Sequence, residues 1–268
     1  MRLGGAWCRT ALRSSRRDRL VTGIAVEIAR RLAPRGLDLA GTFRVQSYNP
    51  QVPRKYRLPT FGRDSTLAVV IGSSKAMWEP FLAWLAHEPR ALDSFHPVDR
   101  YVAGAVRSAL VPVEVRHQVR WAHSRLTRWV AIQKAAYTAG LAYHAPCHLA
   151  IHPRFGLWIG LRAAIAFDLP FAESAGPPAA GAAMAEPHPC DGCDRPCVAA
   201  FERAREATGG RRARDVSPWL AVREVCPRAP EHRYDDLETR YHYAKDRAVL
   251  REALRHAALA SASLTSPR

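Results

Sequence analysis

Residues 169–189, LPFAESAGPPAAGAAMAEPHP, constrain the fold of this chain most, because they interrupt every periodic pattern. The stretch is rich in proline, alanine and glycine, and its apolar residues follow neither helical nor strand spacing. We therefore expect a linker between a larger domain at residues 19–168 and a cysteine-containing segment at residues 190–268. Residues 1–18 are basic, with no acidic residue before Asp18. They are expected to be a disordered extension, with a targeting segment or a misassigned start as alternatives.

Hydrophobic periodicity predicts both helices and strands in the larger domain. The expected helices are 20–32, 78–85, 97–110 and 126–143, and the expected strands are 43–49, 66–72, 111–121 and 157–167. Beyond the linker we expect a helical stretch at 198–224 and a charged helical tail. This mixture, without strict alternation, favours an α+β fold with a small C-terminal appendage.

Composition narrows the class of protein. The chain has 268 residues, of which 48% are hydrophobic, so it can form a sizeable core. The net charge is +16, but residues 1–60 hold thirteen Arg or Lys against three acids, and no nucleic-acid motif accompanies them. We expect no nucleic-acid partner and, since no long apolar run occurs, no membrane span. Cysteines clustered near the C-terminus favour a reducing compartment, the cytoplasm.

The sequence CDGCDRPC places three thiols, Cys190, Cys193 and Cys197, at a spacing that suits a metal. A ferredoxin-like run would have its fourth thiolate where Phe201 stands. Cys226 is separated from Cys197 by 28 residues, so a chain reversal could return it as the fourth ligand. Four thiolates suit iron or zinc. We predict one four-iron (4Fe-4S) cluster, with structural zinc or an unfilled remnant as the alternatives.

Several stretches resemble one known family. They are AIHPRFGLWIGLRAAIAF (150–167), LAVVIGSSKAMWEPFLAWL (67–85), HPVDRYVAGAVRS (96–108), AIQKAAYTAGLAYH (131–144) and, weakly, PEHRYDDLETRYHY (230–243). Together they resemble the cobalamin-processing proteins of the methylmalonic aciduria and homocystinuria type C family. The resemblance implies a nitroreductase-like α+β fold, a mixed sheet flanked by helices, that binds base-off cobalamin and removes its upper ligand. It further implies transfer of alkyl groups to glutathione, and reduction of cyanocobalamin by a reduced flavin, FMN or FAD.

The resemblance also implies roles for individual residues. Cobalamin-binding candidates are Gln133, Tyr137, Gly140, Tyr143, Ile151 and Trp158. Small side chains around Gly140 would let a flat macrocycle approach, although tight helix packing explains them equally. Arg154 of IHPRFG matches an arginine that binds glutathione, and a guanidinium can bind a carboxylate through two parallel bonds. Arg233 aligns more loosely with a second such arginine, and either could instead be a surface residue. Tyr137 stands where animal members have histidine.

The cysteine run resembles a different group, the epoxyqueuosine reductases, which combine cobalamin with two iron–sulfur clusters. This chain has too few cysteines for two. We therefore predict a cobalamin-binding enzyme that removes the upper ligand by reductive decyanation or by dealkylation with glutathione or another thiol. The alternatives are a cobalamin-dependent iron–sulfur reductase and a non-catalytic carrier. Electron-donor or cobalamin-acceptor proteins are the expected partners.

Overall fold

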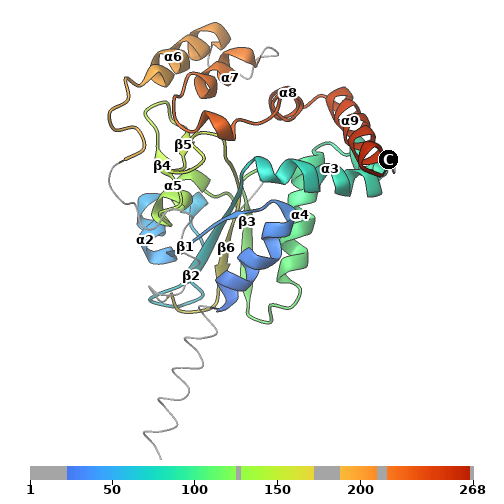
Figure 1. Ribbon diagram of the computed structural model, residues 1–268. Helices are drawn as coiled ribbons and strands as arrows, with labels where there is room; N and C mark the ends of the chain where they lie inside the picture. Colours follow the sequence, from blue (N-terminus) through green and yellow to red (C-terminus); the bar gives the residue numbers. More distant parts are fainter. Residues whose placement is uncertain (1–22, 125–127, 172–187, 210–215, 266–268) are drawn as a thin grey trace, which may run out of the picture.

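The computed structural model describes residues 23–124, 128–171, 188–209 and 216–265. Its centre is a four-stranded antiparallel sheet with strand order β1-β2-β6-β3 (Figure 1). These strands are β1 (Leu39–Arg44), β2 (Leu67–Ser73), β6 (Gly160–Phe167) and β3 (His117–Trp121). A separate two-stranded sheet pairs β4 (Tyr143–His144) with β5 (Ala150–Ile151). The α+β class predicted from the sequence is confirmed, but the main sheet in the described residues is antiparallel rather than mixed.

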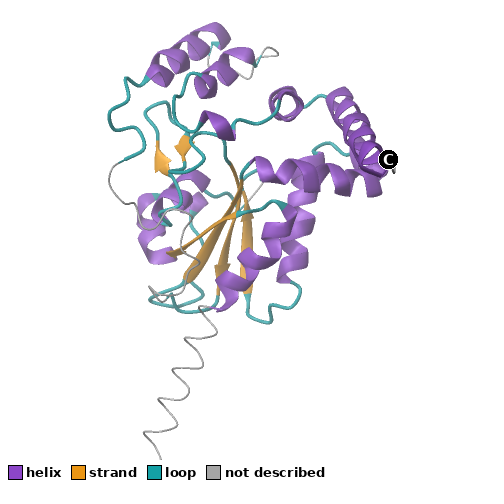
Figure 2. Cartoon of the chain, in the orientation of Figure 1, coloured by secondary structure: helices purple, strands orange, loops and turns teal. Residues whose placement is uncertain are grey.

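Helices cover both faces of the large sheet (Figures 1 and 2). One face carries the helical residues 23–32, α3 (Trp78–His87) and α4 (Pro97–Leu110); the other carries α2 (Val45–Tyr48) and α5 (Ile132–Thr138). The C-terminal helices are α6 (Pro196–Thr208), α7 (Ser217–Glu224), α8 (Asp236–Ala244) and α9 (Arg247–Thr265). Short 3₁₀ turns occupy Ala33–Arg35, Asn49–Gln51, Arg54–Tyr56, Lys75–Met77, Pro89–Asp93 and Pro230–His232. No helix of the described part combines the length and the apolar character that a membrane crossing requires.

Strand β2 divides the hydrophobic core, because all of its residues are buried and successive side chains point to opposite faces. Val69 and Ile71 pack toward α3 and α4, whereas Ala68 and Val70 pack toward α5. Each fully buried side chain of valine size or larger contributes roughly 1.5–3 kcal/mol. Leu250 of α9 also belongs to the α3–α4 core, so the C-terminal helices help to complete the main core.

The domain boundaries predicted from the sequence remain predictions. Most of the predicted linker, residues 172–187, and the N-terminal residues 1–18 lie outside the described ranges. The first linker residue, Leu169, is buried in the main core, and its carbonyl accepts a hydrogen bond from the N–H of Leu67. Leu169, which the prediction assigns to the linker, therefore packs against the sheet.

Helix α4 follows directly from its sequence. Pro97 begins the helix, where its missing N–H costs nothing, and Asp99 in the first turn complements the helix dipole. Its apolar residues recur at helical spacing, so Val102 and Val106 are buried on one side. The predicted bounds, 97–110, are confirmed.

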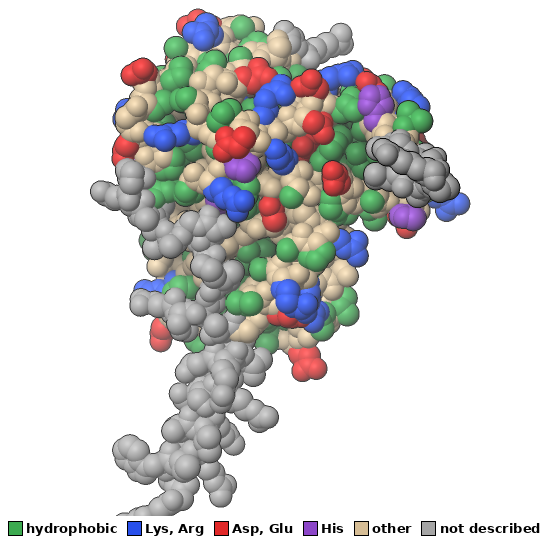
Figure 3. Space-filling model, viewed as in Figure 1, with side chains coloured by type: hydrophobic (Ala, Val, Ile, Leu, Met, Phe, Trp, Pro, Cys, Tyr) green, Lys and Arg blue, Asp and Glu red, His purple; other side chains and the backbone are tan. Residues whose placement is uncertain are grey.

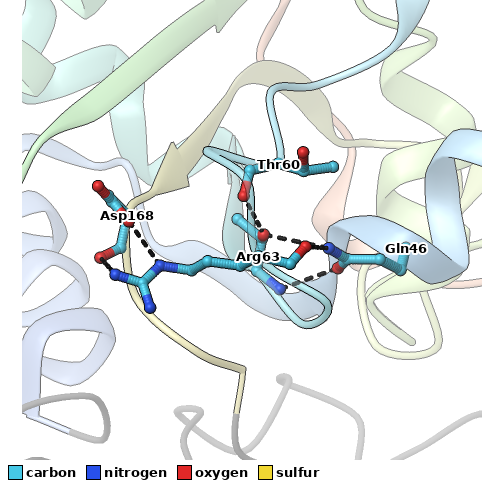
Figure 4. Close-up of polar contacts among 5 residues, drawn as sticks. Gln46, Thr60, Arg63 and Asp168 are labelled. Atoms are coloured by element: carbon cyan, nitrogen blue, oxygen red, sulfur yellow. Dashed lines mark hydrogen bonds and ion pairs between the residues drawn. The ribbon is translucent and has the colours of Figure 1, made fainter.

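The predicted strand at 43–49 is wrong beyond Arg44, and the side chain of Gln46 is the reason (Figure 4). Its Oε1 accepts the N–H of Thr66 at 2.8 Å, and its Nε2 donates to the carbonyl of Arg63 at 2.7 Å. The Gln46 side-chain amide thus makes the hydrogen bonds that the next backbone pair of the strand would have made. The backbone can therefore leave the strand and begin α2. Arg63 also contacts Asp168 at the far end of β6, which closes this end of the sheet.

Four further expectations are corrected: one helix, two strands and the helical stretch at 198–224. The helix predicted at 126–143 is only Ile132–Thr138, because Gly140 adopts a left-handed φ of 66° and Tyr143 pairs in β4. The strands predicted at 111–121 and 157–167 begin later, with β3 and β6. The stretch predicted at 198–224 forms two helices, α6 and α7, with residues 210–215 between them outside the description.

Candidate functional site at one end of the sheet

Two cavities lie at the end of the sheet where β1 and β6 begin and β2 ends. The first, a cleft of about 570 Å³ that we name the arginine cleft, is lined by Asp38, Ser74, Lys75, Ala76, Trp78, Glu79, Arg154, Phe155, His232, Arg233, Asp235 and Glu238. It therefore brings together the two arginines that the sequence predicted for glutathione. Acidic and basic side chains are intermixed over the molecular face in Figure 3.

A six-residue turn, Ile151–Gly156, presents Arg154 to this cleft, and we name it the Arg154 turn. The imidazole Nδ1 of His152 accepts the N–H groups of Arg154 at 3.0 Å and Phe155 at 3.3 Å. The backbones of His152 and Gly156 exchange hydrogen bonds of 2.8 and 2.9 Å. The turn is therefore held without any ligand, with Arg154 exposed at its tip.

Gly156 fits this position because it has no side chain. Its φ is 56°, a left-handed value, and a Cβ atom there would lie 2.5 Å from the carbonyl oxygen of Arg228. Any larger residue would combine backbone strain with a steric clash. The glycine thus allows the chain around Arg228 to pack directly on the Arg154 turn.

The protonation of His152 is fixed by its surroundings. Burial, with the nearby Arg154 and His232, lowers the pKa of His152 to about 4, so the imidazole is neutral at pH 7. Because Nδ1 accepts two N–H groups, the proton resides on Nε2. Protonating Nδ1 would break both bonds, which links the shape of the turn to pH.

The two arginines of the cleft differ in their availability. Within the described residues Arg154 has no carboxylate at ion-pair distance, and its guanidinium lies 5.1 Å from the centre of the Phe155 ring. Arg233 instead contacts Glu224 at 3.0 Å and Asp236 at 2.9 Å, which raises its pKa. Arg154 can therefore bind an added carboxylate at once, whereas Arg233 would first have to release its partners.

A buried acid and a buried histidine separate this cleft from the second cavity. Burial, and next the Asp235 carboxylate, raises the pKa of Glu238 to about 9, and burial holds the pKa of His242 well below 6.5. Glu238 Oε1 and His242 Nε2 are 3.5 Å apart, and neither atom has a hydrogen-bond partner among the described residues. Both pKa shifts favour the uncharged forms of these groups over an ion pair.

The second cavity, about 370 Å³ and named here the inner cavity, lies between β6 and helices α6 to α8. Its lining consists of Cys147, His148, Leu149, Ile159, Gly160, Arg162, Phe201, Trp219, Val222, Arg223, Tyr234, His242 and Tyr243. Arg162 lies flat against Gly160, where a Cβ atom would be 2.6 Å from the guanidinium, and it donates to Ser73 Oγ at 3.0 Å. The cavity is therefore aromatic and positively charged.

The predicted cobalamin-binding residues do not share one surface. Tyr143, Ile151 and Trp158 are buried among other apolar side chains. Gly140 is also buried and forms the turn after α5. These four residues have evident packing or backbone roles.

Two candidates remain accessible on α5. Gln133 is half-buried, and Tyr137 is 37% exposed, with its ring stacked on His144 at a centroid distance of 5.0 Å. The small residues Ala135 and Ala136 pack toward the sheet rather than outward. Tight helix packing accounts for these two alanines, and only the outer side of α5 is open to a ligand.

The structure brings the four predicted metal-binding cysteines into one neighbourhood. Cys190, Cys197 and Cys226 are buried in one apolar cluster, and Cys193 is half-buried beside them. None of them forms a disulfide. Burial, and then the neighbouring thiols, raise the pKa of Cys190 to about 11. In the ranges that the structure describes, no three or more His, Cys, Asp or Glu side chains are arranged to hold a metal ion.

Sequence reasoning missed several residues of this region. Asp38, Lys75 and Glu238 reach the cleft from segments far apart in the chain, and no local pattern marks them. Cys147 lies in the same apolar cluster as the other thiols and is hydrogen-bonded to Cys197. Its separation from the cysteine run hid this proximity in the sequence.

Comparison with known proteins gives sequence relatives and a solved structure, although no family model matches the chain. The cyanocobalamin reductase / alkylcobalamin dealkylase of Bos taurus is 31% identical over 168 residues, which is 54% of this chain and 58% of the bovine protein. The human protein of the same name is 28% identical over 152 residues, 50% of this chain and 53% of that protein. The chain therefore spans little more than half the length of these curated relatives.

The crystal structure of the C. elegans B12-trafficking protein CblC, a human MMACHC homologue, matches with a TM-score of 0.64. The match covers 85% of this chain and 94% of the other, at 20% sequence identity, so it establishes a shared fold. The mammalian relatives and this fold together confirm that the chain resembles the cobalamin-processing family.

Proposed function

We propose that this protein binds cobalamin and removes its upper axial ligand, by thiol-dependent dealkylation or by reductive decyanation. The observation that carries the proposal is the placement of Arg154, exposed and without an ion-pair partner in the described chain, at the tip of a preformed turn in the arginine cleft. The names of the sequence relatives, which this chain matches over about half their length, support the same activity.

The cleft suits a thiol tripeptide such as glutathione. Its volume, about 570 Å³, lies in the usual range for small-molecule sites. Glutathione carries two carboxylates and one ammonium group, and the cleft offers both signs of charge. Arg154 and Lys75 can bind carboxylates, while Glu79 and Asp235 can bind the ammonium group.

The charge of Arg154 also favours the reactive form of a bound thiol. A nearby guanidinium stabilises the thiolate over the thiol and so lowers the thiol pKa. The thiolate attacks the methyl carbon of methylcobalamin, the cobalt–carbon bond breaks, and its electron pair remains on cobalt. The products are a thioether and cob(I)alamin, so electrons and atoms balance without a further reactant.

We place the corrin on the outer side of α5, where Gln133 and Tyr137 are accessible. Phe155, next to Arg154, packs in the same apolar cluster as Ala135 and Ala136 of α5. The thiol cleft and this helix therefore share one hydrophobic cluster. Cobalamin is bound by apolar contact and neutral amide hydrogen bonds, for which Gln133 and Tyr137 provide suitable groups.

Decyanation needs electrons from outside this set of residues. A reduced flavin, FMN or FAD, bound or delivered by an electron-donor protein, supplies them, and cyanide departs with the bonding electron pair. Unpaired cysteines and a glutathione-dependent reaction are compatible with a reducing compartment such as the cytoplasm.

The test is glutathione-dependent demethylation of methylcobalamin by the full chain, with cobalamin titration of the same samples. Arg154→Ala removes a charge-assisted hydrogen-bond pair, for which a loss of about 1.5–3 kcal/mol is typical, or roughly ten- to a hundredfold in glutathione affinity. Cobalamin affinity should change far less. Arg154→Lys should restore part of the affinity, because it keeps the charge but not the planar fork.

Arg90→Ala is the matched control, since Arg90 is exposed and lies outside the cleft. It should leave both measurements unchanged. If Arg154→Ala weakens cobalamin binding but not the glutathione dependence, the role assigned to Arg154 is wrong. Stoichiometric binding of methylcobalamin without turnover would instead identify a carrier.

A further inference from the structure

Two backbone segments aim N–H groups at cysteine sulfurs, a feature that the proposed function does not use. In the segment His188–Cys197, named here the cysteine turn, the N–H of Arg195 donates to Cys193 Sγ at 3.4 Å. In the return segment 226–229, the N–H of Arg228 is directed at the thiol of Cys226. In both cases the donor lies two residues after the cysteine.

Such hydrogen bonds have little value for a neutral thiol, which is a weak acceptor. They strengthen when the sulfur is a thiolate, and N–H groups directed at metal-bound sulfur stabilise and tune metal centres. The same arrangement occurs at Cys193 and Cys226, in segments that are far apart in the chain. These N–H groups are therefore placed where they would bond metal-bound sulfur at two of the four cysteines.

The backbone of the cysteine turn is folded back on itself, and the N–H of Arg195 points at the Cys193 sulfur. Gly192 and Arg195 have left-handed φ values of 66° and 55°. For arginine this conformation is unfavourable, so the surrounding contacts must maintain it. The N–H of Cys190 donates to His188 Nδ1 at 3.0 Å, which fixes the start of the turn.

The return segment is tied to the cysteine turn by its own contacts. The guanidinium of Arg228 donates to the carbonyl of Asp191 at 2.8 Å. Ala229 has a left-handed φ of 56°, which turns the chain away after Cys226. The fourth cysteine thus returns to the first three, as a four-ligand site requires.

The apolar cluster around these thiols is small for the segment that it supports. Besides the cysteines, its buried members from α6 and α7 are only Ala200, Ala204 and Val222. Small units with so little core are commonly stabilised by disulfides or by a metal. No disulfide forms among the described cysteines.

We propose that Cys190, Cys193, Cys197 and Cys226 bind a metal centre as four thiolates, either an iron–sulfur cluster or a zinc ion. Each thiol loses one proton on binding. The side chains do not surround a common point in this structure. Each cysteine has a single side-chain torsion, χ1, so metal binding would require these four side chains to rotate toward a common point.

The experiment measures iron, acid-labile sulfide and zinc in the full chain purified without air. A cubane cluster gives about four iron and four sulfide per chain, and a structural site gives about one zinc. Cys226→Ser should lower the metal content at least fivefold. Cys147→Ser is the matched control, because Cys147 is a buried thiol of the same apolar cluster but is not one of the four ligands.

Three outcomes would overturn the proposal. One is a folded chain that contains less than about a tenth of an equivalent of metal and takes up neither iron with sulfide nor zinc. Another is equal metal loss in Cys226→Ser and Cys147→Ser. The third is a disulfide between Cys147 and Cys197 in the purified, metal-free protein. Demethylation by glutathione, measured on the same samples, reports separately on the proposed function.

Discussion

The Arg154 turn and the cysteine turn are both short loops with left-handed residues, but different groups hold them. In the Arg154 turn the imidazole of His152, a good acceptor, receives the N–H groups, and the backbone closes on Gly156. In the cysteine turn an N–H group donates to the sulfur of Cys193, a poor acceptor while it is protonated. The first turn is complete without a ligand, whereas the proposed metal centre would complete the second.

The two turns both contact Arg228. The carbonyl of Arg228 faces Gly156, and the guanidinium of the same residue reaches Asp191 in the cysteine turn. A substitution that displaces Arg228 from the Arg154 turn should therefore also disturb the cysteine turn. The largest predicted effect uses this connection.

We predict that Gly156→Ala lowers the free energy of unfolding by more than about 3 kcal/mol. A left-handed alanine costs about 1–2 kcal/mol, and here the added Cβ also meets a backbone carbonyl at 2.5 Å. Denaturant unfolding measures the loss. Metal content should fall in the same variant, because Arg228 has to move.

Gly62→Ala provides the control for backbone strain alone. Gly62 has a left-handed φ of 76°, but no atom lies within 4 Å of an added Cβ. Gly62→Ala should lower the free energy of unfolding by only about 1–2 kcal/mol and leave the metal content unchanged. Equal losses of unfolding free energy in the two variants would mean that the contact between residue 156 and Arg228 adds nothing to the cost of backbone strain.

The same contrast explains what could be predicted from the sequence. Helix α4 was predictable because Pro97 and an apolar stripe act locally, and Arg154 was identified through its motif. The end of β1 could not be predicted locally. There the side-chain amide of Gln46 bonds to the backbone of Thr66 and Arg63, which are distant in sequence, in place of a strand hydrogen bond. The contact of Gly156 with Arg228 likewise depends on segments that meet only in the folded chain.

The next prediction concerns the pH dependence of the Arg154 turn. The folded-state pKa of His152, about 4, lies below its ordinary value of 6.5, so the unfolded chain binds more protons in this window. Stability from His152 is complete above pH 6.5 and is lost as the pH falls to 4, by about 3 kcal/mol in total. Denaturant unfolding between pH 7 and 4 measures the slope.

His152→Asn should flatten that slope, because its side-chain oxygen can accept the same N–H groups without titrating. His242 titrates in the same direction in both proteins, so the difference between them isolates His152. Identical slopes would show that His152 does not govern the acid sensitivity of the turn.

A third prediction concerns Glu238, on the wall of the arginine cleft. Its folded-state pKa, about 9, exceeds the ordinary 4.5, so its contribution to stability is present below pH 4.5 and is lost as the pH rises to 9. At pH 7 the buried carboxyl therefore costs up to about 3 kcal/mol relative to a neutral group. Glu238→Gln should raise the melting temperature at pH 7 and have little effect at pH 4. A destabilised Gln variant at pH 7 would mean that the carboxyl is ionised and paired.

The smallest predicted effect separates the two arginines of the cleft. Arg233 is held by Glu224 and Asp236, and all three side chains are more than a third exposed, so each pair contributes well under about 1 kcal/mol. Arg233→Ala should therefore lower stability only slightly and reduce glutathione affinity by less than about threefold. A double variant with Glu224→Gln and Asp236→Asn frees Arg233 and should make the cleft bind glutathione more tightly through it. If Arg233→Ala alone weakens glutathione binding as much as Arg154→Ala does, the ion pairs of Arg233 open in solution, and both arginines bind the ligand.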